Sequence, residues 1–259
     1  MIYKEMTKRI REVCKKLLDD KTADVIIAYR GGGIAGLLTP YFARMPDEVG
    51  NIEWGDRCYQ NLAAYLPGLD IKAAILAKPC DARAIAQYIK EHQVKRENVF
   101  IIGVDCIGMV DENGNPRPGC GDCEVRSPRI FDEYIKDERV FALKEKKDSA
   151  ECDDLAGDFT KFQKEIEKCI LCCACRQACY GCYCKSCFIE REMPSFLPAD
   201  VDSGTKMTFH LGRAMHLAGR CVECGACEAS CQSGVNVRYL IKGVTDFIKE
   251  INEGGEPLA

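Results

Sequence analysis

Two runs of cysteines in this chain have the spacing that holds an iron–sulfur cluster. Both runs read Cys-x2-Cys-x2-Cys-x3-Cys, at residues 169–179 and 221–231. In bacterial ferredoxins this spacing wraps a 4Fe–4S cluster, and the fourth cysteine of each run ligates the cluster held mainly by the other run. The expected ligands of a first cluster are Cys169, Cys172, Cys175 and Cys231, and those of a second cluster are Cys221, Cys224, Cys227 and Cys179.

Zinc is the alternative metal, because zinc sites also use Cys-x2-Cys spacing. A tetrahedral zinc ion takes only four ligands, so the third cysteine of each run would have no role. Two runs of four cysteines at identical spacing therefore favour iron–sulfur clusters, and with them a protein that transfers electrons.

The composition indicates a compartment and excludes some partners. The chain has 19 cysteines in 259 residues and begins with a charged amphipathic segment rather than an apolar secretory signal. Secreted disulfide-rich domains are shorter, so we expect clusters in a reducing cytoplasm, as in anaerobic metabolism. The net charge of -4 predicts no surface for nucleic acid. Since no apolar run approaches about 20 residues, we expect no direct membrane span.

Four more cysteines follow predicted strands in the first half of the chain. Cys80 comes after an apolar stretch that ends at residue 77, and Cys106 after one that ends at residue 104. Cys120 and Cys123 lie in the glycine- and proline-rich loop that follows. Because the loops after parallel strands emerge at one edge of a sheet, these four cysteines should converge there. They predict a third 4Fe–4S cluster, with zinc as the alternative.

Another group of cysteines directly follows the first run. Cys182, Cys184 and Cys187 could form a fourth metal site, for a cluster or for zinc, whose last ligand the sequence does not identify. They could instead be alternative ligands that displace Cys179. Cys58 and Cys152 have no partner in the sequence, Cys173 lies inside the first run, and Cys14 is expected to be a packed core thiol.

The elements that must position these cysteines predict a mixed chain of the α+β or α/β class. Strands are expected at 24–29, 71–77 and 99–104, and a helix at 82–91. The strands carry few charges, which is typical of a mainly parallel sheet covered by helices. The charged stretch 144–149 indicates a boundary between an α/β domain, residues 1–150, and a ferredoxin-like dicluster domain, residues 151–259.

The second domain is longer than a compact ferredoxin. Helices are expected at 154–168, 206–217 and 237–251. Residues 180–220 form an insertion between the two runs, and it contains His210 and His216. These histidines could donate hydrogen bonds to cluster sulfurs, but a helix that merely packs beside a cluster is the simpler interpretation.

A glycine-rich turn is the candidate for a nucleotide or flavin site. Arg30, Gly31, Gly32 and Gly33 follow the first strand, where backbone amides can cradle phosphate. The turn lacks the full dinucleotide fingerprint, so a plain tight turn is the alternative. Arg30 and Lys78 are the candidate anion contacts for FAD or FMN.

Several segments resemble one protein family. They lie at 78–85, 96–99, 103–108, 169–188 and 216–227. They resemble the beta-subunit family of coenzyme F420 hydrogenases and formate dehydrogenases, and the cysteine-rich segments resemble its bacterial iron–sulfur branch. The likeness runs from about residue 24 to the second cysteine run. Tyr180 and Gln232 stand where ferredoxins usually place a proline, which shapes the turn but supplies no ligand.

The resemblance implies a non-catalytic electron-relay subunit of a multisubunit oxidoreductase. Such subunits occur in formate dehydrogenases, in heterodisulfide-reductase-like modules and in flavin-based electron-bifurcating or transhydrogenase complexes. They relay electrons between the flavin or nicotinamide site of a partner subunit and ferredoxin or another partner. Archaeal members bind flavin and reduce a deazaflavin, so the alternative is a flavin-containing subunit that itself reduces such a two-electron carrier.

Overall fold

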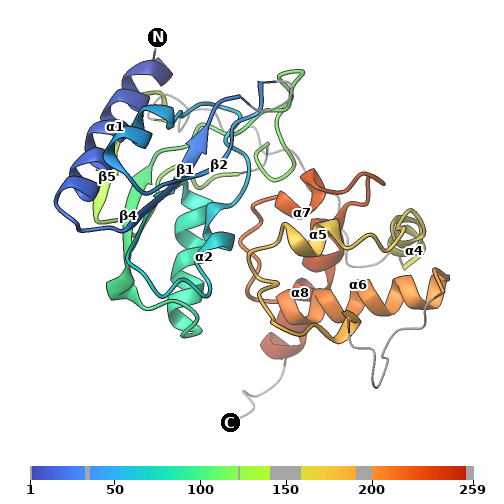
Figure 1. Cartoon of the computed structure of the whole chain (residues 1–259). Coiled ribbons are helices and arrows are strands. Elements are labelled where there is room, and N and C mark those ends of the chain that lie inside the picture. The colour runs from blue at the N-terminus through green and yellow to red at the C-terminus, as the bar shows by residue number, and fades with distance from the viewer. Residues whose placement is uncertain (1, 33–35, 122, 141–158, 191–199, 255–259) are drawn as a thin grey trace. The chain divides into compact units, whose positions relative to one another are not determined.

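The computed structural model describes residues 2–32, 36–121, 123–140, 159–190 and 200–254. The chain divides into two compact units, residues 1–150 and 151–259 (Figure 1). Each unit contains one of the two kinds of cysteine group found in the sequence. We describe the two units separately.

The first unit is built on a five-stranded sheet with the order β2-β1-β3-β4-β5. The strands are β1 (Val25–Arg30), β2 (Thr39–Ala43), β3 (Ala73–Ala77), β4 (Val99–Val104) and β5 (Glu133–Ile135). β1, β3, β4 and β5 pair in parallel, and β2 pairs antiparallel with β1 at the edge. The expected mixed class with a mainly parallel sheet is therefore confirmed, as are the three strands expected from apolar stretches.

Two helices and three 3-10 turns of the first unit have bounds within the described residues. They are α1 (Ile2–Asp19), α2 (Pro79–Lys90), η2 (Pro46–Asn51), η3 (Leu62–Tyr65) and η4 (Arg96–Asn98). α1 packs against β1 and β5 and buries Ile10 and Cys14 completely, so the prediction of a core thiol at Cys14 is confirmed. α2 begins three residues before the expected residue 82, because Pro79 is preorganised for the first helical turn and the Asp81 carboxylate accepts a hydrogen bond from the Lys78 amide.

We expect the core of this sheet to tolerate little loss of volume. Ile75 is fully buried in β3, where it pairs with Ile27 of β1 and Ile101 of β4. Ile75→Val should lower the free energy of unfolding by about 0.5–1.5 kcal/mol, because it removes one buried methylene from a close-packed site. Urea denaturation of the two proteins would measure this, and an unchanged midpoint would show that the site repacks.

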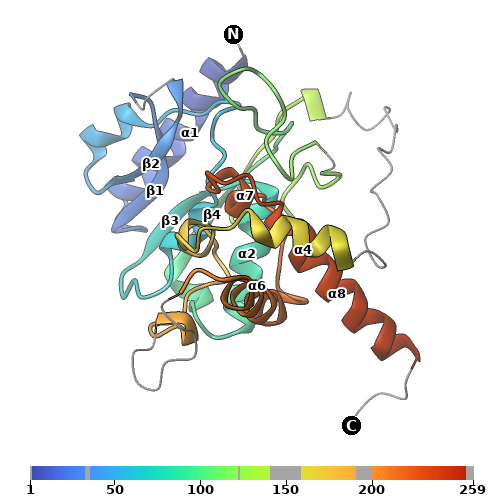
Figure 2. The same ribbon diagram turned by 90° about the vertical axis from the view of Figure 1, so that its right-hand side faces the viewer.

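The second unit is helical in its described part. Its helices are α4 (Phe159–Glu167), α5 (Ala174–Gln177), α6 (Ser203–Leu217), α7 (Ala226–Ala229) and α8 (Val237–Gly254), with a 3-10 turn η5 (Phe188–Glu190). α6 packs against α4 and α8 (Figure 2), and its Phe209 and Leu217 share a core with Leu240 and Ile241 of α8. Residues 154–158 of the expected helix 154–168 lie outside the described residues.

α6 starts at Ser203, before the expected residue 206, because Asp202 caps it. The Asp202 carboxylate accepts a hydrogen bond from the Thr205 amide at 2.7 Å, which satisfies one of the free donors of the first turn. Among the described helices, none has the length and apolar character required to cross a bilayer.

Candidate metal centres

The two ferredoxin-like runs adopt the same backbone conformation. Leu171 and Glu223, the third residues of the runs, both have φ of 54°. The fifth residues, Cys173 and Gly225, have φ of 59° and 71° and each precedes a short helix, α5 or α7. Left-handed backbone at a leucine, a cysteine and a glutamate costs free energy, so the surrounding loop must require it. Identical spacing has produced identical loops.

Both loops direct backbone amides at the first cysteine sulfur of the run. The Leu171 amide donates to Cys169 Sγ at 3.3 Å, and the Glu223 amide donates to Cys221 Sγ at 3.4 Å. The Val235 amide donates in the same way to Cys231 Sγ at 3.3 Å. Hydrogen bonds of this kind stabilise a thiolate and tune the potential of a cluster bound to it. The loops are thus suited to hold anionic sulfur.

The structure brings the expected first ligand set together. Cys169, Cys172, Cys175 and Cys231 line one cavity of the second unit, together with Cys173 and His210. Cys231 lies far from the others in sequence, and the turn after α7 delivers it to the first run. The exchange of fourth cysteines between runs, which defines a bacterial dicluster ferredoxin, therefore has the geometry it needs on this side.

The expected second ligand set is arranged around a buried arginine. Cys221, Cys224 and Cys227 lie close enough to interact electrostatically. The guanidinium of Arg213 on α6 interacts with Cys227, and also with Cys175 and Cys179 of the first run. Cys179 forms a side-chain hydrogen bond with Cys182, so the two thiols are neighbours. The assignment of Cys179 or of its neighbour as the fourth ligand stays a prediction.

Burial determines the protonation of these thiols. It raises the pKa of Cys175 to about 11 and that of Cys106 to about 12, and it raises the pKa of Cys227 still further. Without a metal ion these sulfurs are therefore protonated thiols at neutral pH, and binding of a metal would release their protons. A buried thiol of this kind is a poor free nucleophile.

One of the two histidines of the insertion lies beside a ligand set. His210 is 3% exposed and lines the cavity of Cys169 and Cys175. Burial and the positive charge of Arg213 lower the pKa of His210 to about 4, so its imidazole is neutral. A neutral imidazole can still donate one N–H to a sulfur. Its role as a hydrogen-bond donor to a cluster stays a prediction.

Three of the four expected cysteines of the first unit lie together after β4, and Cys80 follows β3. Cys106 interacts electrostatically with Cys120 and Cys123, and the Gly108 amide donates to Cys106 Sγ at 3.4 Å. Cys80 lies in the first turn of α2, after β3, beside the ammonium of Lys78. Sequence reasoning missed Cys58, which is fully buried and interacts with Cys106. No local sequence pattern indicates that Cys58 lies near Cys106, because Cys58 is outside any cysteine run.

The expected ligand sets consist of thiols, and the choice between clusters and zinc stays a prediction. Among the described residues, no group of three or more Cys, His, Asp or Glu side chains is arranged to hold a metal ion. A zinc ion draws all four ligands to about 2.0–2.3 Å from one centre, whereas each iron of a cube takes one thiolate and leaves the sulfurs further apart. Thiolates with amide donors are the ligands that such clusters use.

Lys78 has partners inside the protein. It is 1% exposed, and its ammonium donates to the Gln60 carbonyl at 2.8 Å and to the Tyr29 hydroxyl, and lies 2.9 Å from Asp81 Oδ2. Burial opposes the charge, but Asp81 and Tyr29 more than offset this and hold the pKa of Lys78 well above its usual value. The side chain is thus a buried cation beside Cys80, and its expected contact with a flavin or phosphate stays a prediction.

The glycine-rich turn lies at an open cavity. Arg30, Gly31 and Gly32 line a hollow of 720 Å³ together with Arg11, and Gly33 lies outside the described residues. Gly32 has φ of 97°, which favours glycine. Arg30 is exposed and lies over the ring of Tyr41 at 5.1 Å from its centroid. Glu53 also lines the hollow and lies against Gly31, so the two guanidiniums share it with a carboxylate. The expected phosphate or flavin site at this turn stays a prediction.

Comparison with known proteins identifies relatives. No family model matches the chain. The beta subunit of an F420-dependent formate dehydrogenase from Methanocaldococcus jannaschii is 22% identical over 87% of this chain and 85% of its own length. The beta subunit of F420-dependent formate dehydrogenase 1 from Methanococcus maripaludis is 31% identical over 37% of this chain and 26% of its own length. The resemblance seen in the sequence is thereby confirmed: the chain is similar, over most of its length, to a beta subunit of an F420-dependent formate dehydrogenase.

Proposed function

We propose that the chain is an iron–sulfur electron-transfer subunit of a multisubunit oxidoreductase of the formate dehydrogenase type. The observation that carries this proposal is the shared conformation of the two cysteine runs, with an amide donating to the first sulfur of each. The similarity to beta subunits of formate dehydrogenases supports it, because such a subunit works beside others. Heterodisulfide-reductase-like and electron-bifurcating complexes are the related assemblies that the proposal includes.

In this role the chain passes electrons between a flavin or nicotinamide site on a partner subunit and ferredoxin or another partner. Clusters on the ligand sets of Cys169 and Cys221, and a third on Cys106, Cys120, Cys123 and Cys80, would supply one-electron steps. Thiolates of this chain hold the irons, and its backbone amides and buried cations set the potentials. A reducing cytoplasm is the proposed compartment, in keeping with the unbonded cysteines among the described residues.

Arg213 should raise the potentials of the two ferredoxin-type clusters. Its buried charge lies among cysteines of both runs, so it favours the added negative charge of the reduced clusters. We expect Arg213→Gln to lower the reduced-to-oxidised ratio at fixed potential roughly tenfold, which is about 59 mV for one electron. Redox titration followed by electron paramagnetic resonance measures this. Arg213→Lys keeps the charge and is the matched control, and unchanged potentials in the glutamine variant would contradict the expectation.

The proposal is tested on the chain isolated anaerobically with its partners. Iron, sulfide, zinc and flavin are measured per chain, and the co-purifying proteins are identified. At least eight irons, with a dehydrogenase or flavoprotein as partner, would support the relay, and about twelve would support the third cluster. Zinc in place of iron would overturn the proposal.

The alternative function is a flavin-containing subunit that reduces a deazaflavin itself. The open cavity lined by Arg11, Arg30 and the glycines favours it, because it offers cations and amides to a phosphate or pyrophosphate. The relatives are named as F420-dependent, which suits the same chemistry. Stoichiometric FAD or FMN on the purified chain, lost in Arg30→Gln, would move the catalytic site into this subunit. A chain free of flavin would exclude this alternative.

A further inference from the structure

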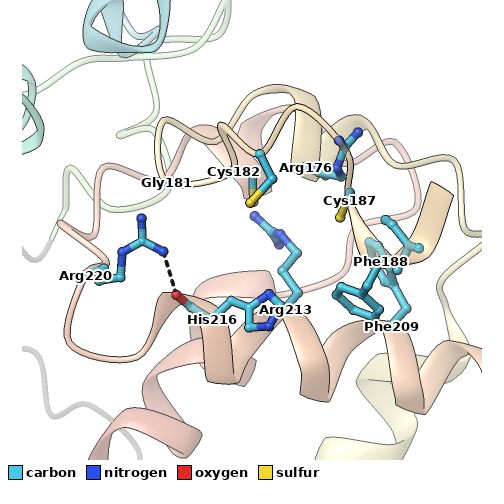
Figure 3. A pocket seen from close by; sticks show the side chains of 11 residues that line it. Arg176, Gly181, Cys182, Cys187, Phe188, Phe209, Arg213, His216 and Arg220 are labelled. Carbon is cyan, nitrogen blue, oxygen red and sulfur yellow. Dashed lines mark hydrogen bonds between the residues drawn. The ribbon is translucent and has the colours of Figure 1, made fainter. Parts of the chain in front are cut away.

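A second cavity of the cysteine-rich unit has not been used by the proposed relay. It has a volume of 280 Å³ and lies between α6 and the segment that follows the first run. Cys182, Cys184 and Cys187 line it from that segment, and Arg213 and His216 line it from α6 (Figure 3). The ligand set around Cys169 lines a different cavity, so this hollow is distinct from that set. Cys182 also contacts Cys179, the expected fourth ligand of the second set.

A buried guanidinium with free donors reaches into this cavity. Arg213 is 4% exposed, and its Nη2 donates to the Cys175 carbonyl at 3.0 Å. Its Nε and Nη1 are buried and have no hydrogen-bond partner among the described residues. Figure 3 shows the guanidinium directed toward Cys182. A buried charged donor without an acceptor lowers the stability of the folded protein through its desolvation free energy. An anionic ligand with several acceptors would offset that desolvation free energy.

The side chains around the cavity restrict what that ligand can be. Its lining residues include four that can bind iron, which are Cys182, Cys184, Cys187 and His216. The imidazole of His216 is held by edge-to-face packing on Phe188, with ring centroids 5.3 Å apart. Arg176, 8% exposed, supplies a second cation to the lining. Arg220 is a third cation of the lining, and three thiols, one imidazole and three cations are the donors that an anionic cluster would use.

A cluster fits this set better than a single metal ion. A 4Fe–4S cube spaces its ligands around four irons, and its inorganic sulfides would accept hydrogen bonds from the N–H groups of Arg213. A zinc ion has no such acceptors of its own. Charge and hydrogen bonding thus favour the same ligand.

We propose that this cavity holds a further 4Fe–4S cluster, ligated by Cys182, Cys184, Cys187 and His216, with Arg213 donating to its sulfides. The proposal rests on the proposed function only in requiring a chain that is loaded with clusters. It names His216 as the last ligand of the Cys182 group. An imidazole in place of a thiolate makes a cluster less negative and raises its potential. This cluster is therefore the one most easily reduced among those of the second unit.

The test compares iron, sulfide and paramagnetic signals of the anaerobic holoprotein and its variants. The double variant Cys184→Ser/Cys187→Ser should lose about four irons and four sulfides and keep the ferredoxin-type signals. His216→Cys should keep its iron and lower the midpoint potential of one signal, because a thiolate replaces the imidazole. Met215→Cys is the matched control, since Met215 is 65% exposed beside His216, and it should change neither quantity.

Each result decides between proposals. A double variant with unchanged iron, sulfide and signals would overturn the further cluster, as would a loss of zinc alone. Unchanged potentials in His216→Cys would overturn His216 as the ligand. If the parent protein holds no iron, the proposed relay function fails; if only the ferredoxin-type signals are present and insensitive to the double variant, the further cluster alone fails.

Discussion

Cys227→Ser is expected to remove one whole cluster, with about four irons and four sulfides, and to destabilise the second unit. Cys227 is 7% exposed and belongs to the core that includes Phe209, Leu217 and Leu240. The helices α5 and α7 of this unit have only four residues each. We therefore expect ligation of a cluster to contribute much of the free energy that stabilises the loops around them. The binding free energy of a structural metal site is at the same time folding free energy.

Iron and sulfide analysis and thermal unfolding of the anaerobic protein measure this effect. Cys173→Gly is the matched control, because Gly225 occupies the corresponding position of the second run with the same left-handed backbone. The control should retain all its iron, and it relieves the cost of a cysteine at φ of 59°. Loss of a cluster from Cys173→Gly, with full iron in Cys227→Ser, would show that the ligand assignment is wrong.

Asp81→Asn should lower the free energy of unfolding of the first unit by about 3–5 kcal/mol, because it leaves the Lys78 ammonium buried without a counter-charge. The Asp81 carboxylate is fully buried, lies 2.9 Å from Lys78 Nζ and accepts the Leu62 amide at 2.7 Å. It thereby connects the start of α2 to η3. Urea unfolding, followed by a probe in the first unit such as the fluorescence of Trp54, measures the change.

The double variant Lys78→Met/Asp81→Leu separates the ion pair from the other roles of Asp81. Replacing both charges by apolar groups removes the desolvation penalty together with the attraction. The double variant still loses the hydrogen bonds to the Lys78 and Leu62 amides, so a residual cost of about 1–3 kcal/mol is expected. A double variant less stable than Asp81→Asn would contradict the argument that the unpaired charge dominates.

Several elements could be predicted because their signals are local. β1, β3 and β4 are continuous apolar stretches, and burial on both faces of a sheet requires that composition. β2 was not predicted, because Thr39–Ala43 contains Pro40 and is only partly buried at the edge of the sheet. β5 has three residues and gains its place only by pairing with β4.

The candidate site divides in the same way. The spacing of each cysteine run dictates its own loop, so the paired runs and their left-handed residues follow from sequence. Other contacts of the site join segments that are distant along the chain. They are the contacts of Cys58 with Cys106, of Cys231 with Cys169, and of Arg213 with thiols of both runs. Such contacts arise only when helices and strands pack.

By itself, the sequence determined the number and spacing of the thiols, the class of the fold and the family, because these depend on short patterns of residue type. Only the tertiary structure decided that α6 buries Arg213 between the two runs and that His216 meets Cys182 and Cys187 at one cavity. The reason is that a side chain's neighbours across space are set by packing of a whole helix face, which no local pattern encodes.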